Sequence, residues 1–191
     1  SLTKYEDIKA VDCDHERFSS GNGITLGLPV DAELPEGALN ISMFIAMDPP
    51  KHDVQRATVS PIVAPMSLKK LEPVIRERVC SILDSLPIGE EFEWVDKVSI
   101  ELTTQMLATL FDFPFEERRK LTRWSDVATA APGTGIVESE EARRAELLEC
   151  LEYFTGLWQE RKVNPGHDLV SMLAHGDNTK DMAPCEFLGN L

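Results

Sequence analysis

Apolar residues recur at intervals of three and four over three long stretches, and this pattern constrains the fold more than any other feature. The stretches are residues 68–86, 95–111 and 138–161. Such spacing places apolar side chains on one face of an α-helix, whereas a half-buried strand requires strict alternation. Residues 91–95 do alternate and predict one short strand. The sequence therefore predicts a mainly α-helical fold with little strand.

The segment from Asp48 to Arg56 predicts a helix with a distinctive polar face. Proline fixes φ and lacks the N–H that a first helical turn leaves unpaired, so Pro49 and Pro50 favour a helix beginning there. Asp48 would cap that helix. His52 and Arg56 are four residues apart and would lie one turn apart on one face, with no acid between them. The pair suits an anion with two oxygens, such as a carboxylate or a phosphate. The same spacing is also common on solvated helix faces.

Composition narrows the class of partner. The chain has 191 residues, 42% of them hydrophobic and 27% charged, as in an ordinary soluble globular protein. The formal net charge of −14 argues against a nucleic-acid partner and against an anionic membrane surface. No apolar run approaches the roughly 20 residues of a membrane span. We therefore expect a small apolar or anionic ligand rather than a nucleic acid or a bilayer.

Four widely spaced cysteines form no C-x-x-C pair and no zinc pattern, which fits a reducing cytoplasm. The cluster from Asp12 to His15 does not predict a metal site, because consecutive residues of a helix point to different faces. We expect no metal site formed by this chain alone, and a cytoplasmic location.

A family resemblance rests on three motifs. The run Asp48-Pro49-Pro50-Lys51-His52, followed by Arg56, resembles the start of helix C in bacterial cytochrome P450 enzymes. The stretches 44–65 and 94–114 resemble the soluble bacterial subfamily that hydroxylates the terminal carbon of medium-chain alkanes. The resemblance covers essentially the whole chain. It implies part of a single cytochrome P450 domain, with helix B and the B–C loop in 1–47, helices C to E in 48–114, the F–G region in 115–165, and helix H and the start of helix I in 166–191.

The resemblance also implies roles for residues. His52 and Arg56 would bind the propionates of haem, and the Gly- and Pro-rich segment 19–40 would be the loop over the haem. The apolar run that follows would line the substrate pocket, with Ile41, Met43, Phe44 and Ile45 as its members. Without the resemblance, this run reads as a buried strand or plain core.

One departure from the family is large. The haem-ligand motif Phe-x-x-Gly-x-x-x-Cys-x-Gly surrounds none of the four cysteines, and the Glu-x-x-Arg motif and the acid–alcohol pair of helix I are absent. We expect these features beyond Leu191, which makes the chain a fragment with half a haem site and no activity alone. The complete enzyme would hydroxylate terminal C–H bonds of medium-chain alkanes or fatty acids, with electrons from a ferredoxin and its reductase. The alternative is a non-catalytic, acidic helical module for ligand binding or for adaptor contacts.

Overall fold

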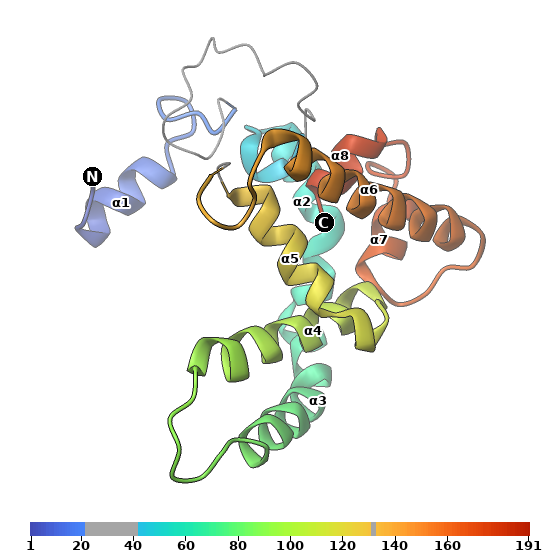
Figure 1. The fold of residues 1–191 in the computed structure, drawn as a ribbon. Helices are drawn as coiled ribbons and strands as arrows, with labels where there is room; N and C mark the ends of the chain where they lie inside the picture. Colours follow the sequence, from blue (N-terminus) through green and yellow to red (C-terminus); the bar gives the residue numbers. More distant parts are fainter. Residues whose placement is uncertain (22–41, 131–132) are drawn as a thin grey trace.

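The computed structural model describes residues 1–21, 42–130 and 133–191, and helices account for all of the regular secondary structure in these ranges. Figure 1 shows their arrangement. The α-helices are α1 (Tyr5–Asp12), α2 (Lys51–Val59), α3 (Pro65–Asp84), α4 (Glu101–Phe111), α5 (Arg119–Thr129), α6 (Glu140–Val163), α7 (Leu169–His175) and α8 (Pro184–Gly189). Short 3₁₀ helices are η1 (Phe44–Ala46), η2 (Ser60–Val63) and η4 (Phe115–Glu117), and the π-helical segment η3 (Val95–Ile100) leads into α4. The prediction of a mainly α-helical fold is confirmed.

Two local predictions were wrong. The expected strand at 91–95 is absent, because Glu93 accepts a hydrogen bond from the backbone N–H of Asp96 and so caps the helical segment that begins at Trp94. Ser67 directly precedes the apolar stretch 68–86 and would be its predicted helix cap, but α3 begins at Pro65. Proline at the first helical position has no N–H to leave unpaired, and the Ser67 hydroxyl instead donates to the Pro61 carbonyl at 2.9 Å.

The core lies where α5 and α6 meet the C-terminal end of α4. Phe113, Trp124 and Phe154 form an aromatic cluster, with ring centroids 6.0 to 6.2 Å apart. A second contact joins α6 to α8, where Trp158 stacks on Phe187 with centroids 4.3 Å apart. Aromatic rings bury large areas and pack in specific orientations, so these contacts fix α8 against α6.

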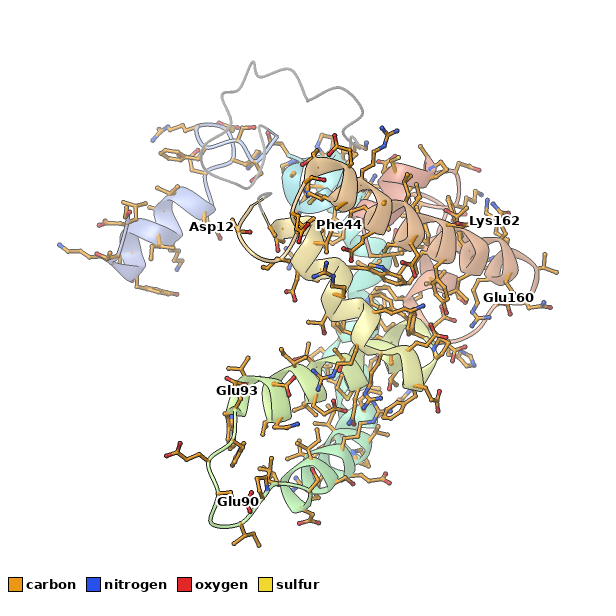
Figure 2. The ribbon with its side chains drawn as sticks, viewed as in Figure 1. Asp12, Phe44, Glu90, Glu93, Glu160 and Lys162 are labelled. Carbon is orange, nitrogen blue, oxygen red and sulfur yellow. The ribbon has the colours of Figure 1, made fainter. Side chains whose placement is uncertain are left out.

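Helices α3 and α4 extend away from this core and diverge from each other toward the loop that connects them (Figure 1). Their connecting loop carries Glu90 and Glu93 at the far end of the molecule (Figure 2). On α4 the buried residues are Thr104, Ala108 and Phe111, which share one face. Five apolar positions of the periodic stretch 95–111 are only half-buried: Val98, Leu102, Met106, Leu107 and Leu110. Helices α3, α5 and α7 pack against α4, but its apolar residues occupy more of the helix circumference than these neighbours cover.

Helix α1 lies apart from the other helices and buries none of its residues (Figure 1). It ends at Asp12, so the neighbouring Cys13, Asp14 and His15 follow the helix rather than lying on it, contrary to the sequence argument. Across 1–21, 42–130 and 133–191, no group of three or more histidine, cysteine, aspartate or glutamate side chains is placed to hold a metal ion. In these same ranges, every helix is too short or too polar to cross a membrane.

Candidate functional site

Helix α2 presents two different polar faces. Lys51 and Gln55, four residues apart, face α8 through their bonds to Glu186. His52 and Arg56, also four residues apart, lie one residue further round the helix. The predicted helix is confirmed and it brings His52 and Arg56 onto one face, which leaves this face as the candidate anion site.

The sequence predicted no acid between His52 and Arg56 on this face, but the adjoining Asp53 contacts His52. The Asp53 carboxylate lies 2.8 Å from Nδ1 of His52, because the two side chains are adjacent where the helix begins. When the Nδ1–H of the imidazole donates a hydrogen bond to Asp53, the ring carries an N–H at Nε2 only in its cationic form, and the neutral ring presents an acceptor there. The His52 side chain is 24% exposed, whereas Arg56 is exposed, with no ion-pair partner among the residues that the structure describes. The face thus has one oriented ring and one available guanidinium.

Asp48 does not cap α2 as the sequence predicted. Its carboxylate accepts hydrogen bonds from the hydroxyl of Ser19 and from the backbone N–H of Ser20, the latter at 2.9 Å. These two bonds hold the pKa of Asp48 below its ordinary value. Pro50 occupies the cap position instead. Asp48 therefore joins the first residues of the Gly- and Pro-rich segment 19–40 to the start of α2, a tertiary role that the local motif could not reveal.

The predicted pocket residues are only partly placed. Ile41 lies outside the described residues, as does most of the segment 19–40. Met43 and Phe44 are half-buried and Ile45 is 50% exposed, at the start of η1. The ring of Phe44, labelled in Figure 2, packs against the imidazole of His52, with centroids 6.2 Å apart and planes at 57°. The apolar run and the candidate anion site are thus neighbours.

A buried polar network behind α2 was not found by sequence reasoning. Gln55, only 4% exposed, donates from Nε2 to Oε1 of Glu186 at 2.7 Å, and accepts from Nδ2 of Asn190 at 3.1 Å. Asn190, 7% exposed, accepts at Oδ1 from the backbone N–H of Phe44 at 2.7 Å. The one sign of this network in the sequence was Asn190, an amide inside the apolar pattern at the end of the sequence. Besides the nearby sulfur of Met182, its partners Phe44 and Gln55 lie more than a hundred residues away.

Glu186 gives this network a charged end. Lys51 Nζ lies 2.7 Å from its Oε1. The Lys51 hydrogen bond holds the pKa of Glu186 below its ordinary value, aided by Gln55 and opposed by partial burial. The carboxylate is 18% exposed, so the pair is partly shielded from solvent. Lys51 is consequently engaged toward α8 and is not part of the face that carries His52 and Arg56.

Comparison with known proteins identifies the fold. No family model matches the chain. The solved structure of cytochrome P450-153 from Novosphingobium aromaticivorans matches all of it, at 43% identity and a TM-score of 0.81. The structure of CYP153D17 from Sphingomonas sp. PAMC 26605 also matches all of it, at 44% identity and a TM-score of 0.80. The chain belongs to the cytochrome P450 family. Its predicted membership is confirmed, as is the expectation of a partial cytochrome P450 fold.

The chain spans less than half the length of these P450 relatives. It covers 47% of each of the two CYP153 chains. A curated P450 relative, the steroid C26-monooxygenase of Mycolicibacterium smegmatis, is 30% identical over 177 residues, which are 92% of this chain and 41% of that protein. Members of the P450 family use haem, a planar iron macrocycle with two propionates. Membership of this family weighs against the alternative of a non-catalytic adaptor.

Proposed function

We propose that the complete protein is a haem-thiolate monooxygenase that hydroxylates the terminal C–H bond of medium-chain alkanes or fatty acids. The observation that carries the proposal is identity of 43–44% along the whole chain to two CYP153 structures, whose subfamily the motifs at 44–65 and 94–114 also resemble. We assign α2, α3 and η3–α4 to helices C, D and E, α5 and α6 to the F–G region, and α7 and α8 to helix H and the start of helix I.

The face of α2 fits the haem propionates by its chemistry. Arg56 is exposed and offers a guanidinium, which can bind a carboxylate in a bidentate manner. His52 is held on one side by Asp53 and on the other by Phe44, so its ring is oriented before any ligand arrives. The Arg56 guanidinium and, in its cationic form, the His52 imidazole would give two donors on successive helical turns for two propionates. When bound, haem would supply the oxygen activation that no side chain of this chain can perform.

Each side chain has a defined task in this proposal. Arg56 and His52 bind and orient the propionates, and Met43, Phe44 and Ile45 exclude water from the apolar substrate beside them. One oxygen atom of dioxygen enters the C–H bond and the other leaves as water, which consumes two electrons and two protons. We propose that a ferredoxin and its NAD(P)H-dependent reductase deliver these electrons in the cytoplasm. None of the four cysteines sits in a haem-ligand motif, so we expect residues 1–191 alone to lack activity.

Haem retention tests the assignment of the propionate site. A charge-assisted hydrogen bond contributes about 1.5–3 kcal/mol, so Arg56→Ala in the complete protein should weaken haem binding by roughly tenfold to a hundredfold. The rate of haem transfer to apomyoglobin measures this loss. The matched control is Arg76→Ala on α3, since Arg76 is 74% exposed and its one ion pair within the described part of the chain is with Glu72, at 3.3 Å. Equal transfer rates for the two variants would refute the assignment.

Product analysis tests the reaction. The complete protein, supplied with NADH, a bacterial ferredoxin and its reductase, should convert octane to 1-octanol with little 2-octanol. Replacing the ferredoxin by a flavodoxin tests the electron donor separately. Hydroxylation at internal carbons only would contradict the terminal assignment, and a complete protein that holds no haem would contradict the monooxygenase assignment.

A further inference from the structure

Two buried amide side chains tie three separate segments together behind α2. Asn190, at the end of α8, accepts from the backbone N–H of Phe44 in η1 at 2.7 Å. Its own Nδ2 donates to Oε1 of Gln55 at 3.1 Å. The Gln55 Nε2 donates in turn to Glu186 at 2.7 Å. The amide oxygen of Asn190 and both ends of the Gln55 amide are therefore used, and each bond joins segments that are distant in sequence.

Hydrophobic burial does not account for this arrangement. A buried amide costs free energy unless it is hydrogen-bonded, and apolar side chains of the same volume would fill the space at least as well. What hydrogen bonds add is direction, because they weaken steeply away from linear geometry, whereas apolar contacts tolerate rotation. The pair therefore sets how α2 is rotated about its axis and where the backbone of Phe44 lies.

Both of these quantities affect the candidate propionate face. The rotation of α2 determines where His52 and Arg56 point, since these two side chains and Gln55 are carried by the same helix. The position of the Phe44 backbone determines where its ring meets the His52 imidazole, at a centroid distance of 6.2 Å. Asn190 is hydrogen-bonded to both Phe44 and Gln55. It can therefore affect the orientation of His52 through the Phe44 ring and through the rotation of α2.

We propose that Asn190 is a positioning residue for the haem-propionate site, acting through Gln55 on the orientation of α2 and through Phe44 on the ring of His52. The inference rests on the proposed function of His52 and Arg56. Asn190 itself does not touch the propionates in this scheme. It pre-organises the groups that do, much as outer-shell hydrogen bonds orient the ligands of a metal.

Two substitutions in the complete protein test the inference. Asn190→Leu keeps the branching and the number of heavy atoms but leaves the Phe44 N–H and the Gln55 carbonyl oxygen without the Asn190 amide. Gln55→Met is a close isostere in a helix, leaves the bond to Phe44 intact, and provides a second measurement should the first variant fold poorly. We expect haem transfer to apomyoglobin to become about tenfold faster in Asn190→Leu and to increase by a smaller factor in Gln55→Met. The haem midpoint potential should fall in both, in the direction given by His52→Ala, because less-well-held propionates stabilise the ferric state.

The control for a general loss of stability is Thr104→Val on α4. Thr104 is fully buried and its hydroxyl donates to the Ile100 carbonyl at 2.9 Å, so the variant also loses a buried hydrogen bond. It should lower the unfolding temperature and leave the midpoint potential unchanged. Since Asn190 and Gln55 act partly through one shared bond, the double variant should raise the transfer rate by less than the product of the single effects.

The outcomes separate the inference from the function beneath it. If His52→Ala and Arg56→Ala shift haem transfer and potential, but Asn190→Leu and Gln55→Met behave like Thr104→Val, the positioning role is overturned and the proposed function stands. If the unsubstituted protein takes up no haem, or His52→Ala and Arg56→Ala change nothing, the proposed propionate site is overturned and the inference with it.

Discussion

Replacing Arg161 with leucine should remove a large part of the stability of the α6–α7 junction. Arg161 is 8% exposed near the end of α6, and its Nε lies 3.1 Å from Oδ2 of Asp168, which is 3% exposed. The same guanidinium reaches Asp112 at 2.5 Å and Glu160 at 3.0 Å. Leucine would leave the Asp168 carboxylate buried without a cation.

The magnitude follows from the exposure of the three acids. Asp112 and Glu160 side chains are 70% and 56% exposed, so water replaces the lost guanidinium and each contributes about 0–1 kcal/mol. Breaking a buried pair on one side costs about 3–5 kcal/mol. Asp168 retains hydrogen bonds from the backbone N–H and the hydroxyl of Ser171, both at 2.8 Å, because it caps α7. We therefore expect the lower end of that range, about 3 kcal/mol.

Urea unfolding followed by circular dichroism measures this change as a shift of the midpoint at unchanged slope. The matched control is Arg144→Leu, an exposed arginine of the same helix, which should change the unfolding free energy by less than about 0.5 kcal/mol. Adding Asp168→Asn to Arg161→Leu should recover part of the loss, since the uncompensated charge is removed while the cap oxygen remains. A loss below about 1 kcal/mol, or no recovery in the double variant, would refute the reasoning.

Three further predictions concern the neighbourhood of α2 and α6. The Lys51 hydrogen bond lowers the pKa of Glu186, so the ionised Glu186 carboxylate stabilises the fold above the unfolded pKa near 4.5, and this stabilisation is lost as pH falls through the folded pKa. Glu186→Gln should therefore make the unfolding temperature depend less on pH, as measured by thermal melts from pH 6 to pH 3. In Gly176→Ala the new methyl would clash with Cγ2 of Thr58 where α7 meets α2, and we expect a loss of about 1–3 kcal/mol in urea unfolding. Burial raises the pKa of the Cys150 thiol to about 12, so a disulfide reagent at pH 8 should modify the two exposed cysteines at once and Cys150 only after unfolding.

Local pattern predicted the helices well because helical periodicity needs no knowledge of the rest of the chain. The stretch 138–161 is α6 almost as expected, and its N-cap Ser139 accepts a hydrogen bond from the backbone N–H of Ala142 at 3.2 Å. The face shared by His52 and Arg56 was predicted for the same reason. A spacing of four residues places two side chains together in any α-helix, whatever surrounds it.

Predictions that depended on tertiary partners were the ones that failed. Asp48 has the sequence signature of a cap, yet Ser19 and Ser20 compete for its carboxylate from 29 and 28 residues away. Gln55 reads as one more solvated position of a polar helix, and only the approach of Asn190, 135 residues later, makes it a buried acceptor. No local rule contains those partners, so the site's supporting layer could not be predicted from the chain alone.

Helix α2 carries the proposed propionate face and yet has little apolar material of its own to fix it. It has nine residues, too few for stable helicity in isolation, and its one buried residue is Gln55. Its placement therefore depends on directional bonds to α8, through Gln55 and Lys51, and on close packing at Gly176. Directional contacts restrict rotation more than apolar packing does, and a misdirected donor loses much of its bond to a carboxylate. A helix that must aim two side chains at one ligand gains more from buried amides than from further apolar burial.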